Sequence, residues 1–301
     1  MLIRDTKSMN KKVNKFRVEN DSMGDVKIPS DALYGPQTQR AVDNFLISDL
    51  VMPREFISSI LHVKIAAAKA NYKLGLIDKK ICETIVRSAE FLQKSYVDEN
   101  FPIDVFQTGS GTSTNMNVNE VISNISKKKF KIKLHPNDHV NMSQSSNDVI
   151  PSAINHCAYS IANTKLLPSL VLLSKEIDSK SKKLRNVVKT GRTHLMDAMP
   201  ITFEQELSGW KSQVDDNISS LKNTLLRLKR LTIGGTAVGT GINAHKLFTK
   251  EFLVALNKNS KLKYIDKKNK FEGSSSQDDV VLYSANLRAI AISLIKISND
   301  L

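Results

Sequence analysis

Apolar positions in the second half of the chain recur at a helical spacing. Between residues 203 and 231 they are separated by three or four positions, close to the 3.5-residue repeat of packed helices in a bundle. At 1.5 Å per residue such a helix would be roughly 40 Å long. The positions of this seam are Phe203, Leu207, Trp210, Val214, Ile218, Leu221, Leu225, Leu228 and Leu231.

Two further long amphipathic patterns flank this seam. One covers residues 154–188 with an interruption near Pro168, and the other covers residues 280–297. Three long helices in one half of a chain favour a helical bundle. Sustained alternation with a period of two residues does not accompany them, so we predict a mainly α fold. The predicted long helices lie at about 155–188, 203–231 and 279–298.

The first half of the chain has shorter patterns, which predict helices at 54–74 and 79–96, followed by polar loops rich in Ser, Thr and Asn. We place a domain boundary near Ser146. It divides the chain into an N-terminal domain, residues 1–146, and a central helical-bundle domain, residues 147–301.

Bulk composition narrows the class of protein. The chain is 41% hydrophobic and 25% charged, as is ordinary for a soluble globular protein. Two cysteines without a CxxC pair argue against a disulfide framework or cysteine-ligated zinc. No uninterrupted apolar run reaches the ~18 residues that span a bilayer, and the segment Met1–Asn20 is too polar for a secretory signal. We therefore expect a cytoplasmic protein without a membrane partner.

The net charge of +14 raises the question of a nucleic-acid partner. Ten of the 44 basic residues are Arg, so the excess is Lys, whereas nucleic-acid readers enrich Arg and interleave aromatic residues. The dense lysine run at 127–133 is typical of a solvated helix end. It could exert a mild pull on dianionic substrates. We expect no nucleic-acid partner.

Polar loops that interrupt the helical patterns carry the candidate chemistry. In the first, residues 109–117, glycines precede hydroxyl and amide residues at a helix start. Backbone N–H groups and the positive end of the helix dipole at such a place receive anions such as carboxylates. Taken alone, the loop fits an elaborate helix cap equally well.

Two more loops follow before the helical second half. The segment 143–148 offers three small donors, Ser145, Ser146 and Asn147, where capping needs only one. In the loop 135–138, His135 lies four residues before His139, a spacing that could suggest a metal. The neighbouring proline makes that helical geometry unfavourable, so we predict no metal site.

A histidine and a glycine-rich segment complete the set. His194, in Gly191-Arg192-Thr193-His194, lies in a polar break between two long helices, where it could move protons or bond to backbone as a structural residue. The segment 234–241 partly fits a dinucleotide fingerprint. It follows a long helix rather than a strand and has no βαβ unit around it, so we exclude nucleotide binding.

Together, the five segments GSGTSTNMN, HPND, SQSSND, GRTH and GGTAVGTG, in this order and spacing, resemble the fumarase/aspartase superfamily and, within it, class II fumarase. The resemblance runs from about Phe16 to Leu301. It implies a catalytic histidine, His194, which handles the proton of water. It also implies substrate contacts at Ser110, Gly111, Thr112, Ser145, Ser146, Asn147 and Thr193, and a secondary carboxylate site at His135, Pro136, Asn137 and Asp138.

The implied activity is fumarate hydratase, a cofactor-free and metal-free lyase that interconverts fumarate and (S)-malate in the tricarboxylic acid cycle. The resemblance also implies a homotetramer with a central bundle and active sites built from three subunits. Hydration of fumarate passes through a carbanion stabilised as an aci-carboxylate. Fixed neutral donors and helix N-termini stabilise such charge without a metal.

One family feature is not found in the sequence. The family's mobile loop GSSxMPxKxNP carries the proposed base for C3, but Gly273-Ser274-Ser275 is followed here by Ser-Gln-Asp, and the sequence ends at Leu301. We therefore expect little hydration of fumarate by the 301 residues alone. Two alternatives stay open: aspartase, which Ser113 favours but His194 and Ser146 oppose, and a truncated, inactive subunit of a fumarase-like assembly.

Overall fold

In the computed structural model, which describes residues 15–301, α-helices dominate, and the predicted mainly α fold is confirmed. The expectation that Met1–Asn20 is no secretory signal lies mostly outside the described residues. The strands of the described part pair only in twos, as three separate two-stranded sheets.

The N-terminal part begins with a hairpin and continues with stacked helices. Strands β1 and β2 pair antiparallel, with Gly24 in the tight turn at φ +107°. The predicted helices at 54–74 and 79–96 are confirmed as α2 and α3. The elements are β1 (Phe16–Asp21), β2 (Gly24–Pro29), α1 (Pro36–Asn44), α2 (Arg54–Lys73), α3 (Lys79–Lys94) and α4 (Thr112–Phe130).

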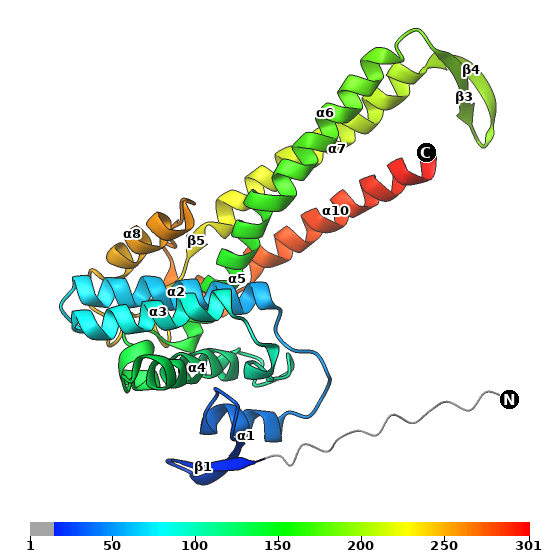
Figure 1. Cartoon of the computed structure of the whole chain (residues 1–301). Coiled ribbons are helices and arrows are strands. Elements are labelled where there is room, and N and C mark those ends of the chain that lie inside the picture. Colours follow the sequence, from blue (N-terminus) through cyan, green and yellow to red (C-terminus); the bar gives the residue numbers. More distant parts are fainter. Residues whose placement is uncertain (1–14) are drawn as a thin grey trace, which may run out of the picture.

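A large apolar core holds this part together. It lies between α2, α3, α4, the start of α5 (Ser146–Ile161) and α8 (Phe248–Ser260), which packs along α2 (Figure 1). Ile57, Ile60 and Leu61 of α2 have no exposed surface, and neither does Phe252 of α8. Residues far apart in sequence therefore share one core, and they fix the loops before α4 and α5 relative to each other.

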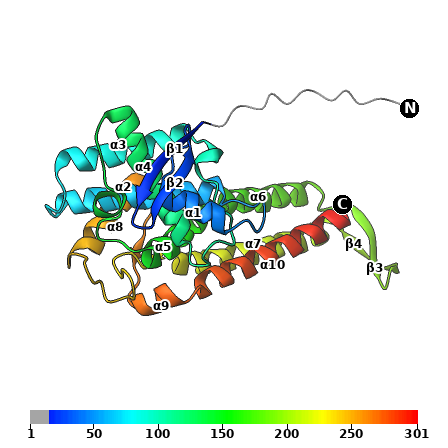
Figure 2. The same cartoon turned by 90° about the horizontal axis from the view of Figure 1, so that it is seen from below.

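Three long helices form an arm that projects from this core, α6 (Leu167–Lys183), α7 (Phe203–Leu228) and α10 (Asp278–Asp300) (Figures 1 and 2). The predicted seam of α7 is buried from Leu207 to Leu228 against α6 and α10. A π-helical turn, Ala162–Leu166, joins α5 to α6. It lies where the sequence indicates an interruption, because Pro168 has no N–H to donate and its ring crowds the preceding turn.

Two of the predicted long helices end earlier in the structure than in the prediction. The helix predicted to reach residue 188 ends at Lys183, and β3 (Val188–Thr193) pairs antiparallel with β4 (Met196–Thr202). The β-branched residues and the glycine of this segment favour an extended chain. Helix α7 ends at Leu228 rather than 231. Arg230–Leu231 forms β5, which pairs in parallel with β6 (Ile265–Asp266). Leu231 is buried in the large apolar core of the N-terminal part rather than in the seam of α7.

Helix α10 is long and apolar enough to cross a bilayer, with a mean hydropathy of 1.6 over its most apolar window. No uninterrupted apolar run of bilayer length is present in α10, because Ser, Asn, Arg and Lys residues divide it. Ile290 and Ile297 are buried in the apolar cluster that α10 shares with α6 and α7. Val281, Ile292 and Ile295, in contrast, are each at least 60% exposed. Only 11% of the window is buried within this chain.

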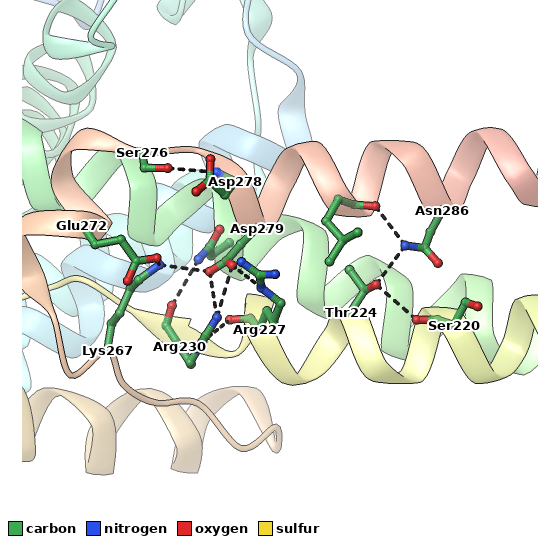
Figure 3. A network of polar contacts seen from close by, with 12 residues as sticks. Ser220, Thr224, Arg227, Arg230, Lys267, Glu272, Ser276, Asp278, Asp279 and Asn286 are labelled. Atoms are coloured by element: carbon green, nitrogen blue, oxygen red, sulfur yellow. Dashed lines mark hydrogen bonds and ion pairs between the residues drawn. The ribbon is translucent and has the colours of Figure 1, made fainter.

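An ion-pair network fixes the start of α10 to the end of α7 (Figure 3). The Asp279 carboxylate accepts hydrogen bonds from Arg227 Nε at 2.7 Å and Arg230 at 3.2 Å. Lys267 Nζ donates to the same carboxylate at 3.1 Å and contacts Glu272, in the short helix α9 (Lys270–Ser275), at 3.0 Å. The network thereby joins α7, the β6–α9 segment and α10.

Candidate active site

The first and third polar loops meet at one open pocket of about 440 Å³. Helix α4 begins at Thr112 and α5 begins at Ser146, so two helix N-termini, each with unsatisfied N–H groups and a positive dipole end, border the same space. Ser110, Gly111, Ser146 and Asn147, predicted as substrate contacts, line the pocket. Apolar walls are supplied by Met52, Phe56, Val105, Ile150, Pro151 and Ile154.

The first loop needs its glycines. Gly109 and Gly111 have φ values of +78° and +73°, in the left-handed region that favours glycine. A Cβ at Gly111 would lie 3.0 Å from the side chain of Ile150. The loop leaves the Ser110 hydroxyl exposed and 3.0 Å from that of Thr112, so the two predicted contacts form one hydroxyl pair. Ser110 lines the pocket, whereas Thr112 is not among its lining residues.

The three donors of the third loop divide into two roles. Ser145 is the N-cap of α5, and its side chain and that of Asp148 form a capping box. Ser145 also lines a separate pocket of about 250 Å³, beside the glycine-rich segment. Ser146 and Asn147 line the larger pocket, and Asn147 also donates to the carbonyl of Ala237 at 2.7 Å. The excess of donors seen in the sequence is therefore real, and the structure places two of the three in the larger pocket.

The glycine-rich segment 234–241 contacts a buried carboxylate through its backbone. Asp148 accepts hydrogen bonds from the N–H groups of Gly234 at 2.8 Å and Thr236 at 2.9 Å. It also accepts one from the N–H of Ser145 at 2.9 Å. Burial raises the pKa of Asp148, and these three donors act in the opposite direction. Asp148 thus ties the third loop to the glycine-rich segment.

A fully buried lysine lies behind the third loop, and the sequence analysis missed it. Lys64, in the middle of α2, donates to Asn141 Oδ1 at 2.8 Å and to Gln144 Oε1 at 3.0 Å. Burial lowers the pKa of Lys64 to about 7, and the nearby charge of Asp148 opposes that shift. A lysine in a helical pattern usually extends into solvent, so only the fold reveals this one.

The serines of the α9 segment also reach the pocket. Ser274 and Ser275, together with Gln277, are among its lining residues. The sequence analysis separated these serines from the family's mobile loop because of the residues that follow them. The structure agrees that they lie beside a helix start, since α10 begins at Asp278, and it adds that they border the candidate site.

Thr193 and His194 are not brought to this pocket within the chain. They lie at the β3–β4 turn, where His194 and Leu195 have φ values of +50° and +61° and are exposed. The hairpin is at the far end of the arm from α4 and α5 (Figures 1 and 2). The 26 residues of α7 alone correspond to about 39 Å. The chain therefore separates the predicted catalytic histidine from the predicted carboxylate donors.

The second loop lies in a different pocket, of about 580 Å³, lined by His135, Pro136 and Asn137. His135 caps the π-helical turn Pro136–Val140, because its Nδ1 accepts the N–H of Asp138 at 3.1 Å. Lys127 and Lys133 line the same pocket, as do the carboxylates of Glu19, Asp21 and Glu120. Within residues 15–301, no three His, Cys, Asp or Glu side chains are grouped to hold a metal.

Comparison with known proteins places the chain in a family. A family model described as lyase matches residues 24–301. The chain is 48% identical over 288 residues to a class II fumarate hydratase of Xylella fastidiosa, covering 96% of this chain and 61% of the relative. It is 43% identical to the class II fumarate hydratase of Wigglesworthia glossinidia brevipalpis, covering 95% and 63%.

Solved structures agree. The class II fumarase of Schistosoma mansoni superposes with a TM-score of 0.91 at 37% identity, covering 95% of this chain and 64% of that one. A fumarate lyase:delta crystallin from Brucella melitensis gives 0.87 at 37% identity. The chain spans less than two thirds of the length of these relatives. The resemblance to class II fumarase drawn from the five loop segments is confirmed, and the chain belongs to the lyase family.

Proposed function

We propose that the protein is a class II fumarate hydratase, a hydro-lyase that interconverts fumarate and (S)-malate. The observation that carries the proposal is the convergence of two helix N-termini on one pocket, which Ser110, Ser146 and Asn147 line and beside which Thr112 pairs with Ser110. Such donors bind a carboxylate and stabilise the additional charge that develops on it when C3 loses its proton. The similarity to class II fumarate hydratases supports the same reaction.

The two halves of the reaction need different groups. A base takes the C3 proton from malate, and the resulting carbanion moves its charge onto the adjacent carboxylate, where the helix N-termini act. The resemblance assigns that base to the family's mobile loop, which residues 1–301 do not carry. Departure of the C2 hydroxyl then requires a proton, which His194 supplies, with water as the product. In the reverse direction His194 takes the proton from the attacking water.

His194 must come from another copy of the chain, because its hairpin lies at the far end of the arm (Figure 1). We therefore propose a homotetramer in which the arms pack together and each hairpin reaches the pocket of a neighbour. The exposed apolar side chains of α10 supply a surface for that packing. We place this assembly in the cytoplasm, as the unpaired Cys82 and Cys157 favour.

We assign a secondary carboxylate site, His135, Pro136, Asn137 and Asp138, to the pocket that the first three of these residues line. Lys127 and Lys133 line that pocket beside Glu19, Asp21 and Glu120, and the two lysines would provide the attraction for a dianion. It shares no lining residue with the pocket at Ser146. The division into domains at residue 146 stays a prediction.

Turnover of the full-length polypeptide made by the cell tests the proposed activity. The ultraviolet absorbance of fumarate is followed with malate and, in a parallel assay, with aspartate as substrate. We expect turnover with malate and none with aspartate. Release of ammonia from aspartate would favour an aspartase instead. The variant His194→Gln should lower kcat by ~10²–10⁴. KM should change much less, because the carboxylate donors remain, and an unchanged kcat would remove His194 from the mechanism.

Mixing of variants tests whether the site is shared between copies. The variants His194→Gln and Ser146→Ala are expressed together so that mixed assemblies form. The first lacks the proton-transferring histidine, and the second lacks a hydroxyl donor of the pocket. Activity well above that of either variant alone is expected, since some pockets then combine an intact Ser146 with an intact His194. The control pairs His194→Gln with Thr193→Val, two changes in one hairpin, which should restore nothing. Failure of the first pair to regain activity would place His194 and Ser146 in the same chain's site.

A further inference from the structure

The two side-chain amides that contact Lys64, those of Asn141 and Gln144, are each oriented by backbone carbonyl groups. Gln144 Nε2 donates to the carbonyls of Val140 at 3.1 Å and Met142 at 3.0 Å. An amide nitrogen can only donate, so the Oε1 of Gln144 must face Lys64. Asn141 is held similarly, because its Nδ2 donates to the Gln144 carbonyl at 3.3 Å. Lys64 is therefore the donor to both side-chain oxygens.

The same logic extends from Lys64 to the pocket. Asn141 Oδ1, the acceptor for Lys64, also lies 3.3 Å from Asn115 Nδ2, so Asn115 presents its NH₂ group to this side. That NH₂ group lies 2.9 Å from Ser146 Oγ. Because the NH₂ group can only donate, Ser146 Oγ must accept. The hydroxyl proton of Ser146 is then left for a partner on its other side.

That other side is the candidate substrate pocket, which Ser146 lines. Among residues 15–301, the Ser146 hydroxyl accepts from Asn115 and is seen to donate to no acceptor. A dicarboxylate in the pocket would provide one. Lys64 Nζ thus lies at the buried end of a chain of hydrogen bonds that runs through two amides and reinforces the direction in which a pocket hydroxyl donates.

We propose that Lys64 is a positioning residue for the substrate, acting through Asn141 and Asn115 to hold the Ser146 hydroxyl as a donor to a substrate carboxylate. This inference rests on the proposed function, since it concerns that substrate. Lys64 is not itself one of the residues that line the pocket. Its contribution comes from fixing a chain of hydrogen bonds whose members polarise each other in a low-dielectric interior.

A double-mutant cycle in the full-length polypeptide tests the proposal. Ser146→Ala should lower kcat/KM by ~10²-fold, as the loss of one preorganised donor does. Lys64→Met should lower it by at least ~10-fold, and the double variant should be no worse than Ser146→Ala alone, because both changes remove one interaction. Lys69→Met is the matched control: the same helix carries it, its Nζ bonds the exposed Asn259 side chain at 2.9 Å, and kcat/KM should not change.

A second variant leaves the lysine in place, in case Lys64→Met does not fold. Asn115→Asp keeps the shape but offers acceptors where Asn115 donates, so the Ser146 proton turns inward and away from the substrate. A loss of kcat/KM as large as that of Ser146→Ala is expected, again without further loss in combination with Ser146→Ala.

The outcomes separate the two proposals. If the wild type hydrates fumarate but the losses of Lys64→Met and Ser146→Ala multiply, or Asn115→Asp keeps its activity, the role of Lys64 is refuted and the function stands. If the wild type neither turns over malate nor binds succinate in a calorimetric titration, the proposed function fails and the inference that rests on it fails too.

Discussion

At the scale of single residues, the interior of the N-terminal part contains a pair of histidines without ionic partners. His156 of α5 is 3% exposed and lies between the rings of His62 and Tyr264, at centroid distances of 5.2 and 5.1 Å. Neither ring nitrogen of His156 has a hydrogen-bond partner among the described residues. Burial, together with the neighbouring His62, lowers the pKa of His156 from its ordinary 6.5 to about 3.

This histidine should make the fold sensitive to acid. The unfolded chain takes up the proton below pH 6.5 while the folded chain does not, so stability falls as pH drops from 6.5 toward 3. Phe in place of His156 keeps the ring stacking and cannot titrate. We expect the difference in free energy of unfolding between pH 8 and pH 5 to shrink by ~2 kcal/mol in His156→Phe, measured by urea denaturation at the two pH values.

Tyr264→Phe is the matched control. Burial raises the pKa of Tyr264, so its hydroxyl stays neutral throughout this range. That hydroxyl is buried without a partner, and its removal should stabilise the fold by ~1 kcal/mol at both pH values. A His156→Phe protein that keeps the full pH dependence would show that other groups cause it.

The sequence identifies polar residues in loops better than polar residues in helices. Ser146 and Asn147 could be found because they exceed what a helix cap needs, and the structure places both in the pocket. Lys64 could not be found this way, because it lies within a helical pattern whose buried face is decided by the packing of α2 against distant segments. Asn115 lies in the first polar segment, but the sequence does not indicate its contact with Ser146.

At the scale of secondary-structure elements, the buried Asp279 network decides how the arm leaves the core (Figure 3). The Asp279 side chain is 4% exposed and that of Lys267 is 7% exposed. Burial alone would raise the pKa of Asp279, but the hydrogen bonds from Lys267 and Arg227 outweigh it, and the net effect is a lowered pKa. The stabilisation is therefore complete above the ordinary value of 3.8 and is lost as pH falls through the lower, folded-state pKa.

Asp279→Asn should destabilise the fold by ~3 kcal/mol at neutral pH, the lower end of the range for a buried ion pair that loses one partner. The lower end applies because Arg227 and Arg230 reach solvent, at 42% and 34% exposure. The control is Asp278→Asn, which changes the same charge in the same first turn of α10 but on an exposed residue. Equal urea midpoints for the two variants would refute a structural role for the network.

Elements with a strong period were predictable, and elements fixed by distant packing were not. The seam of α7 is confirmed from Leu207 to Leu228, because its spacing alone specifies a buried helix face. The β3–β4 hairpin was read as a helix end and a polar break. Its strands are mostly exposed and pair only with each other, so no buried alternation marks them. His194 consequently lies in the turn of a β-hairpin rather than in a loop between helices.

At the scale of the whole molecule, the arm exposes apolar side chains. On α10, Val281, Ile292 and Ile295 are exposed although the helix meets the apolarity of a bilayer span. The same arm carries His194 away from the donors that would share its substrate. Both features have one explanation in the proposed homotetramer, where neighbouring arms would cover α10 and the hairpin of one copy would reach the pocket of another.

The exposed face of α10 therefore provides the test of assembly. Ile292, 60% exposed in the isolated chain, should be buried between copies, so a glutamate there would place an unpaired charge in an apolar interface. We expect Ile292→Glu to sediment as a smaller species than the wild type and to lose turnover, although it lies on the arm rather than in the pocket. Val254→Glu is the control, since Val254 of α8 is equally apolar and 58% exposed but is not part of the arm; it should keep both assembly and turnover. Full activity of a monomeric Ile292→Glu protein would mean that each chain completes its own site, and the shared-site assembly would have to be abandoned.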